Sequence, residues 1–365
     1  MCFYAMQVVT CTLATVDSKC SRSHISFVTS VHRLHIDIKV IATITNMSPL
    51  LPPPRENQTY VSVSALIGGH ITLADHFFVY PSEPGASRTV PSLVFLVTHP
   101  NPPENGVFGK KSKPYRLLFD LGLRKAAERY KPVMQQHLQN RRPYKLGPGI
   151  REQLEEHNLP ADSIDAVMLS HVHYDHHGDP CDFPTSTFII GHGAMSVLKD
   201  GLSGAASHQH FESDLLDAHK VIELPSPSTS PATPQWAPLG PFPSALDLFS
   251  DSSVYILDVP GHLPGHLNLL CRISPTKWLC LCGDAFHDPR LLTGEKGIGT
   301  WEDGGVVHCI HVDKATAEES IGRLRELRRA GGEGVEVELV AAHDEVWTAG
   351  KERGSGGGLW PGVLE

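Results

Sequence analysis

The sequence predicts an α/β domain that begins at about Val61. Two observations predict this fold class: strand-like apolar runs alternate with helical patterns, and clusters of His and Asp follow several of the strands. The chain has 365 residues, of which 41% are hydrophobic and 19% charged, so it can build a sizeable core and does not have the composition of a disordered protein. Length alone would allow two domains of roughly 100–200 residues, but no linker divides the chain into two independent halves.

The strand-like runs are short, apolar and bounded by turn residues. They are Val61–Ile67, Ser92–Thr98, Tyr115–Phe119, Ala166–Ser170, Thr187–Ile190, Val254–Val259, Trp278–Cys282 and Val335–Ala341. Helical spacing predicts helices over Gly149–His157 and Ala315–Arg329. Asp313 is the expected N-cap of the second helix and Gly331 its C-terminal stop.

The remaining segments divide the chain further. Residues 1–46 are expected to be a poorly ordered extension or a gene-model artefact, and 47–60 form a Pro-rich arm. Residues 61–348 are the predicted domain, with 224–243 as an exposed Pro-rich loop insertion, and 349–365 are a Gly-rich tail. The segment 99–113 is rich in Pro, Gly and Lys and is expected at the tip of a hairpin.

Composition excludes some functional classes. The chain carries 31 Lys+Arg against 40 Asp+Glu, a formal net charge of −9, which is unfavourable for binding nucleic-acid phosphates. No apolar stretch approaches the ~18–20 residues that span a bilayer, so we expect no membrane insertion. The 8 cysteines are scattered without a CxxC pair, which favours reduced, mostly buried thiols in a cytoplasmic protein.

The segment 169–178, LSHVHYDHHG, carries the main chemical signal in a chain that has 22 histidines. It contains an HxHxDH motif directly after the predicted strand Ala166–Ser170. Alternate residues of an extended chain face the same way, so His171 and His173 can hold one metal ion together. Asp175 and His176, just beyond, can turn toward a second metal, and imidazole and carboxylate suit Zn²⁺ and related ions.

Further candidate ligands follow three other predicted strands. The segment 260–266, PGHLPGH, follows one strand, Asp284 follows a second, and His343 with Asp344 follows a third. Sites in α/β sheets gather at the carboxyl ends of strands. We therefore expect these side chains to meet the HxHxDH segment at one edge of the fold.

These motifs resemble those of the metallo-β-lactamase superfamily. HxHxDH, PGHxPGH, GDA and AHD occur in the order typical of that family, over roughly Val61 to Trp347. The stretches DVPGHLPGHLNLL and GDAFHDPRLLTGE are similar to the two-metal quorum-quenching lactonases that open N-acyl homoserine lactones, in a fungal branch. The resemblance implies a four-layer αβ/βα sandwich, in which two mixed β-sheets are flanked by helices.

The resemblance also assigns metal ligands for two Zn²⁺ ions, with Mn, Fe or Co as alternatives. His171, His173 and His266 would bind the first ion; Asp175, His176 and His343 would bind the second; and Asp284 would bridge both. His262 would stabilise the loop rather than bind metal. Asp120 is a candidate brace behind the site, with a turn role as the alternative.

The implied reaction is the opening of a lactone or ester by a metal-bridging hydroxide. Asp175 would also pass a proton to the leaving group. The lactonases have a Tyr three residues after the bridging Asp, and this sequence has His287 there. We interpret His287 as a second catalytic residue that would polarise the substrate carbonyl, with plain packing as the alternative.

Other interpretations stay open at the sequence level. The same site could cleave a thioester (as glyoxalase II or a polyketide thioesterase does) or a β-lactam, and a binding scaffold on a degenerate hydrolase fold is the non-enzyme alternative. The expected partner is a small-molecule substrate, with no nucleic acid and no membrane, for a monomer or homodimer. Phe286, Trp301 and Leu202 are candidates for lining an acyl pocket, with core packing as the alternative. Several histidines are expected at the surface or in ordinary hydrogen bonds: His177, His192, His208, His210, His219, His308 and His311.

Overall fold

The computed structural model describes residues 51–104, 112–202, 210–228, 234–329, 334–353 and 358–364. The chain divides into two compact units, Met1–Met47 and Ser48–Glu365, and all described residues belong to the second. The predicted extension over 1–46 and the helix stop at Gly331 therefore lie outside the described residues.

The first sheet has six strands in the order β1-β3-β4-β5-β6-β7. The strands β1 (Ser62–Ala74), β3 (Ser87–His99) and β4 (Tyr115–Phe119) pair antiparallel. The strands β5 (Ala166–Met168), β6 (Thr187–Ile190) and β7 (Lys220–Glu223) continue the sheet in parallel. The parallel strands direct their carboxyl ends to one edge, which is where the HxHxDH segment leaves β5.

The second sheet also has six strands, in the order β16-β12-β11-β10-β9-β8. The strands are β8 (Ala237–Leu239), β9 (Phe242–Asp247), β10 (Val254–Asp258), β11 (Leu267–Arg272), β12 (Lys277–Leu281) and β16 (Glu336–Val340). Neighbours from β8 to β12 are antiparallel, and β16 joins β12 in parallel. Both sheets are therefore mixed.

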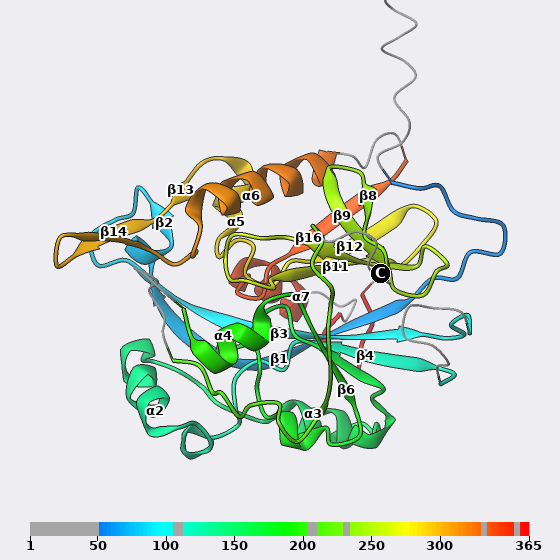
Figure 1. Ribbon diagram of the computed structural model, residues 1–365, viewed down its shortest axis with the longest axis horizontal. Helices are drawn as coiled ribbons and strands as arrows, with labels where there is room; N and C mark the ends of the chain where they lie inside the picture. Colours follow the sequence, from blue (N-terminus) through cyan, green and yellow to red (C-terminus); the bar gives the residue numbers. More distant parts are fainter. Residues whose placement is uncertain are drawn as a thin grey trace, which may run out of the picture. The chain divides into compact units, whose positions relative to one another are not determined.

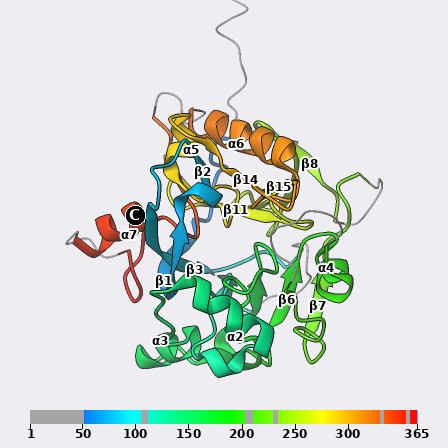
Figure 2. The same ribbon diagram turned by 90° about the vertical axis from the view of Figure 1, so that its left-hand side faces the viewer.

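Helices cover the outer faces of the two sheets (Figures 1 and 2). On the first sheet's side lie α2 (Pro132–Leu138), α3 (Ile150–Glu156) and α4 (Ala194–Asp200); α5 (Pro289–Thr293) and α6 (Lys314–Arg329) cover the second sheet, and α7 (Glu345–Arg353) follows β16. The shorter elements are the 3₁₀ turns η1 (Asp75–Phe77), η2 (Ala127–Arg129), η3 (Gln139–Arg141), η4 (Ala161–Ser163) and η5 (Pro180–Asp182), the pair β2 (Val79–Tyr80) with β13 (Gly297–Ile298), and the hairpin β14 (Thr300–Asp303) with β15 (Val306–Cys309).

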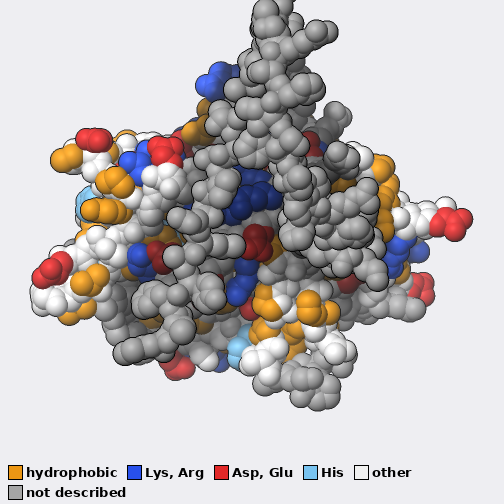
Figure 3. All heavy atoms as spheres, turned by 90° about the horizontal axis from the view of Figure 1, so that it is seen from above, with side chains coloured by type: hydrophobic (Ala, Val, Ile, Leu, Met, Phe, Trp, Pro, Cys, Tyr) orange, Lys and Arg blue, Asp and Glu red, His pale blue; other side chains and the backbone are white. Residues whose placement is uncertain are grey.

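Three apolar clusters hold these layers together. One lies between the sheets and includes Phe95 and Leu281. Another packs α3 and α4 onto the first sheet through Leu154 and Val197, and the third packs α6 onto the second sheet through Leu324. The result is the predicted four-layer αβ/βα sandwich. The outer face seen in Figure 3 mixes hydrophobic, basic and acidic side chains among the described residues.

The predicted elements agree with the structure in type, and β4 and β6 also agree in their bounds. Asp313 caps α6, since its carboxylate accepts the Thr316 backbone N–H at 3.0 Å. The sequence analysis did not predict β7, β9 and β11. The expected exposed loop over 224–243 was too long, because residues 237–239 form β8 and Leu224 is buried.

The C-terminal part of the described chain lies on the first sheet. The predicted boundary at 348 falls inside α7, which continues to Arg353. Beyond it, the Trp360 N–H donates to the Ala65 carbonyl at 2.7 Å and the Leu364 N–H to the Val63 carbonyl at 2.7 Å. This part of the Gly-rich tail adds backbone pairing to β1.

No helix among the described residues is long and apolar enough to cross a membrane. The cysteines in the described part of the chain are free thiols; Cys271, Cys280 and Cys282 are buried, as the sequence predicted, and Cys181 is exposed.

Candidate metal centre

The HxHxDH segment forms a compact turn at the carboxyl end of β5. The His176 and His177 N–H groups both donate to the His173 carbonyl, which folds the segment back on itself. The Leu267 N–H donates to the Ser170 carbonyl at 2.8 Å and ties this turn to β11 of the second sheet. The turn therefore lies where the two sheets meet.

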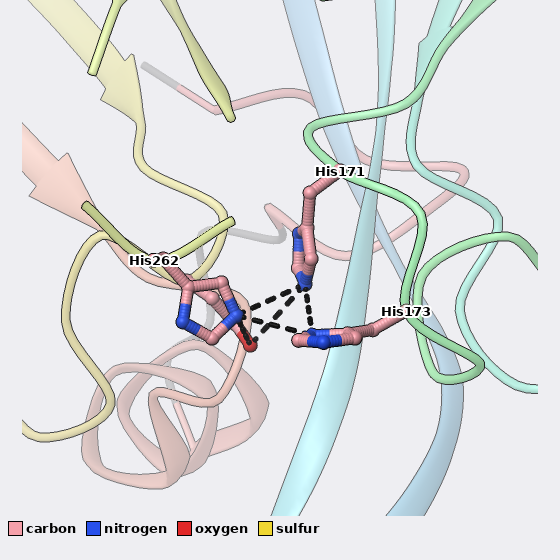
Figure 4. A group of neighbouring side chains, drawn as sticks. His171, His173 and His262 are labelled. Atoms are coloured by element: carbon pink, nitrogen blue, oxygen red, sulfur yellow. Dashed lines mark hydrogen bonds and ion pairs between the residues drawn. The ribbon is translucent and has the colours of Figure 1, made fainter. Parts of the chain in front are cut away.

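One group of candidate ligands consists of His171, His173, His262 and Asp284. Figure 4 shows the three imidazoles facing one another, two from the HxHxDH turn and one from the loop after β10. His171 Nε2 lies 2.8 Å from His173 Nδ1, and His262 Nε2 lies 3.2 Å and 3.1 Å from these two atoms. All four side chains are buried.

A second group consists of Asp175, His176 and His343. The Asp284 carboxylate lies between the two groups. Its Oδ1 is 3.3 Å from His176 Nε2 and 3.4 Å from His343 Nε2, while its Oδ2 is 3.4 Å from His262 Nε2. Each oxygen of Asp284 thus faces a different group, which is the geometry that a bridging carboxylate requires.

In the first group, the structure places His262, rather than the predicted His266, within reach of His171 and His173. Both ring nitrogens of His266 bind backbone: Nδ1 lies 3.0 Å from the Val259 carbonyl oxygen, and Nε2 accepts the Asp284 backbone N–H at 3.1 Å. Through these bonds His266 supports the turn that carries Asp284. The remaining sequence-predicted ligands converge as expected.

Hydrogen bonds on the far ring nitrogens orient the histidines. His176 Nδ1 lies 2.9 Å from Asp120 Oδ2, and His343 Nδ1 lies 2.7 Å from the Pro91 carbonyl oxygen. Asp120 also accepts the Ser170 N–H at 2.6 Å and the Ser170 hydroxyl at 2.8 Å, and that hydroxyl lies 3.0 Å from His171 Nδ1. Partners of this kind hold each ring in one orientation, so that its Nε2 atom points toward a metal. Asp120 therefore acts as the brace considered from sequence.

Two glycines allow the ligand loops to approach closely. Gly283 precedes Asp284 with φ +48°, and a Cβ there would lie 2.7 Å from the Ser170 Cβ. Gly261 precedes His262 with φ +124°, and a Cβ there would lie 2.3 Å from the Ala317 backbone nitrogen of α6. Both conformations are unfavourable for residues with a side chain.

The protonation states of the first group suit metal binding. Burial lowers the pKa of His173 to about 4 and lowers the pKa values of His171 and His262 well below the ordinary value. These imidazoles are therefore neutral at pH 7 and offer lone pairs. Burial acts to raise the pKa of Asp284, but the neighbouring histidines, led by His176, hold it well below its usual range. In the second group, burial acts to lower the pKa of His176, but Asp284 and Asp120 raise it well above its ordinary value.

The residues present fit a metal centre on this chemistry. Buried neutral imidazoles and a buried carboxylate are the donor set that Zn²⁺ and related ions prefer. His176 Nε2 and His343 Nε2 both face Asp284 Oδ1, at 3.3 Å and 3.4 Å, and all three side chains are buried. A cation between the groups would satisfy these atoms.

A small cavity of about 20 Å³ lies over the two groups. His287 lines it, with Nε2 3.0 Å from Asp284 Oδ2, and so does Asp175, whose Oδ2 is 3.6 Å from His343 Nε2. Of the acyl-pocket candidates, Trp301 lines an adjacent cavity, while Phe286 is fully buried in the core and Leu202 packs against the cluster over the first sheet.

Sequence reasoning missed two residues near the centre. His311 was expected at the surface or in an ordinary hydrogen bond, yet it is buried with its ring 5.0 Å from that of His262 and 5.3 Å from that of His287. Arg141 lines the cavity from η3, far from every motif. An isolated Arg in a polar segment gave no signal that could have identified it.

No family model matches the chain. Several curated proteins match the chain in sequence. Metallo-hydrolase mfmC of Annulohypoxylon moriforme is 30% identical over 223 residues, 59% of this chain and 53% of that protein. Gamma-lactamase FDB1 of Fusarium pseudograminearum is 28% identical, over 65% of this chain and 56% of that protein.

Cytochrome P450 monooxygenase mpaDE of Penicillium roqueforti is 28% identical over 76% of this chain, but the matched region is 31% of that protein. The chain thus spans about a third of the length of this relative and about half of the two hydrolases.

Among solved structures, an N-acyl homoserine lactone hydrolase with N-hexanoyl-L-homoserine at its catalytic metal centre has a TM-score of 0.57 at 15% identity, over 84% of this chain and 100% of the other. AidC, a dizinc quorum-quenching lactonase, has a TM-score of 0.51 at 15% identity, over 87% and 94% of the two chains. The fold, the ordered motifs and these relatives agree. The chain has the four-layer fold of the metallo-β-lactamase superfamily, and the proteins that it resembles include a metallo-hydrolase and lactonases.

Proposed function

We propose that this protein is a two-metal hydrolase that opens the ring of a lactone or related cyclic ester. The observation that carries the proposal is Asp284, whose two oxygens face two separate groups of buried ligands. His171, His173 and His262 would hold one ion, and Asp175, His176 and His343 the other. Two Zn²⁺ ions, or Mn, Fe or Co, would supply Lewis acidity and a water whose pKa is lowered toward neutrality.

The chain's own residues would complete the reaction. Asp175 lines the cavity and is proposed to pass a proton to the leaving oxygen. His287 lines the same cavity and is proposed to donate an N–H to the substrate carbonyl, where one donor is typically worth about 3–4 kcal/mol. Most of the side chains that line the cavity are buried.

The second candidate substrate is a cyclic amide. It is favoured by the relative named gamma-lactamase FDB1 and by a second one, gamma-lactamase MBL2 of Gibberella moniliformis, which is 29% identical over 70% of its length. Opening a lactone and opening a lactam need the same centre and differ in the leaving atom. Thioester and β-lactam substrates remain alternatives on the same geometry.

We also propose a small-molecule substrate and a cytoplasmic location. The free thiols support this location: Cys280 Sγ and Cys282 Sγ lie 3.7 Å apart, without a bond between them. Quorum quenching would follow only if N-acyl homoserine lactones prove to be substrates.

Hydrolysis of a substrate panel by the zinc-reconstituted protein tests the function. The panel contains an N-acyl homoserine lactone, dihydrocoumarin, a γ-lactam, S-lactoylglutathione and nitrocefin. We expect turnover of a lactone that falls by at least about a thousand-fold in Asp284→Ala, because both ions lose a ligand. The exposed Asp303→Ala is the matched control and should retain full activity.

Lactam turnover without lactone turnover would replace the proposed substrate by the second candidate. Turnover of only the thioester or the β-lactam would overturn both. A protein that binds no metal and shows no metal-dependent turnover would support the scaffold interpretation instead.

A further inference from the structure

A second cavity of about 280 Å³ adjoins the metal centre. It shares Phe78, Arg141 and Ile310 with the smaller cavity over the ligands, so these residues form the junction between the two. A substrate whose ring lies over the metals would extend past this junction. The second cavity is large enough for a ring system or a short side chain.

The walls of this cavity are mainly apolar and aromatic. Phe77 and Trp301 contact each other edge to face, with their ring centroids 4.7 Å apart, and both line the cavity. Phe78 is buried, and Ile310 is partly buried against the same core. Aromatic walls of this kind favour flat apolar groups.

Arg141 is the cation at the junction. Other arginines of this region pair with carboxylates: Arg124 Nη2 lies 2.8 Å from Glu212 Oε2, and Arg129 Nε lies 2.7 Å from Asp179 Oδ1. No described carboxylate forms an ion pair with Arg141, and its Nε is buried without a hydrogen-bond partner in the described part of the chain. Burial raises the pKa of the Tyr174 phenol, and the nearby Arg141 guanidinium acts in the opposite direction, so Arg141 lies beside this phenol.

Burying a guanidinium N–H without a hydrogen-bond acceptor beside an apolar cavity costs free energy, unless a bound ligand accepts a hydrogen bond from it. Guanidinium groups bind carboxylate and related oxyanions through two parallel hydrogen bonds. Neutral His137 borders the same cavity, because burial lowers its pKa to about 4, so it adds no competing charge. The junction therefore combines an apolar pocket with one unneutralised positive charge.

We propose that Arg141 binds an anionic oxygen substituent of the substrate, and that the substrate class is an aromatic lactone bearing a carboxylate or phenolate. This inference rests on the proposed function for the identity of the reacting ring. The aromatic portion would lie between Phe77, Phe78 and Trp301, and its anionic group would face the guanidinium.

The test compares dihydrocoumarin with a dihydrocoumarin that carries a carboxylate on its aromatic ring. We expect the metal-loaded protein to prefer the charged lactone in kcat/KM. Arg141→Gln should reduce this preference by roughly ten- to hundred-fold, the usual effect of a hydrogen bond to a charged group, while the neutral lactone changes less than about three-fold. Arg141→Lys should keep part of the preference, since it keeps the charge.

Arg142→Gln is the matched control. Arg142 is exposed beside Arg141, and its Nε donates to Gln139 Oε1 at 2.7 Å, away from both cavities. It should leave the preference unchanged. Equal losses for both lactones in Arg141→Gln, or an unchanged preference, would overturn the proposal.

Calorimetric titration with benzoate and benzamide separates this inference from the proposed function. We expect benzoate to bind roughly ten-fold more weakly to Arg141→Gln than to Arg142→Gln, and benzamide to bind both alike. That result would support the anion site even if neither lactone is hydrolysed. Benzoate binding that is unaffected by Arg141→Gln, in a protein that does hydrolyse lactones, would overturn the anion site and leave the hydrolase intact.

Discussion

The loop after β10 contains two Pro-Gly-His repeats with the same local sequence and different surroundings. In the first, Pro260–His262, the imidazole faces the metal-ligand group; in the second, Pro264–His266, it binds two backbone groups. Both histidines are buried. Their surroundings make the difference, so a repeated motif does not identify which copy is the ligand.

Backbone contacts explain the two positions. The first repeat lies against the start of α6, where the Val312 N–H donates to the His262 carbonyl at 3.0 Å and the Asp313 N–H to the Gly261 carbonyl at 2.9 Å. The second repeat leads directly into β11, and the His266 carbonyl accepts the Val259 N–H at 3.2 Å. One ring therefore projects from the loop tip into the site, and the other lies beneath the turn that carries Asp284.

The largest effect is expected from His262→Ala. Removing this imidazole leaves the first group with two histidines and Asp284. We therefore expect the variant to lose one metal equivalent and its activity to fall by more than about a hundred-fold. This loss is larger than the usual effect of a residue that only orients a ligand. Elemental analysis and lactone hydrolysis measure this. Unfolding of the chelator-treated variant should differ less from the wild type than that of His266→Ala, since the His262 ring has no backbone hydrogen-bond partner among the described residues.

His266→Ala should lower the stability of the fold rather than the metal content. It leaves the Val259 carbonyl and the Asp284 N–H unpaired in the interior, so we expect the free energy of unfolding to fall by about 2–4 kcal/mol. Urea unfolding of the chelator-treated protein measures this, with His262→Ala under the same conditions as the control. If His266→Ala instead lost one metal equivalent at wild-type stability, the roles of the two repeats would be reversed.

Asp120→Asn tests a residue that orients a candidate ligand without belonging to either ligand group. Asp120 orients His176 and Ser170 without facing the cavity, so we expect metal affinity to weaken by about 10–100-fold while two ions still bind at saturation. Competition with a chelating dye measures the affinity. Asp162→Asn, on the exposed turn η4, is the control, and an Asp120→Asn variant with wild-type affinity would refute the bracing role.

The smallest effect is expected at Asp258, the last residue of β10 before the first repeat. Burial raises the pKa of Asp258 to about 6, while Arg323 and His192 act in the opposite direction. The folded state therefore binds more protons than the unfolded chain between about pH 4 and pH 6, and stability falls as pH rises through this window. Asp258→Asn should flatten this slope and stabilise the protein at pH 7 by roughly 1–2 kcal/mol.

Urea unfolding of wild type and Asp258→Asn at several pH values across this window tests the expectation. The metal-free proteins should be compared, so that metal binding does not contribute to the pH dependence. An identical slope in the two proteins would show that Asp258 is not the group that titrates.

Much of the fold could be predicted from the sequence, because its strands are buried on both faces and appear as continuous apolar runs. The strands β4 and β6 and the helix α6 illustrate this. The strand β7 was not predicted, since its residues Lys220 and Glu223 are exposed and its pattern is not apolar. The strand β8 was hidden by the prolines around it.

The sequence by itself determined which residue types stand after which strands, and this placed most of the site: the HxHxDH turn, Asp284 and His343 each follow a strand at the same edge. Only the tertiary structure placed His262, rather than His266, beside His171 and His173, and only it brought Arg141 and His311 beside the centre. The reason is that spacing along one strand or turn fixes a side chain's direction locally. Which imidazole faces the site depends also on contacts with other segments of the chain. His262 contacts His171 and His173, and His266 accepts the Asp284 N–H.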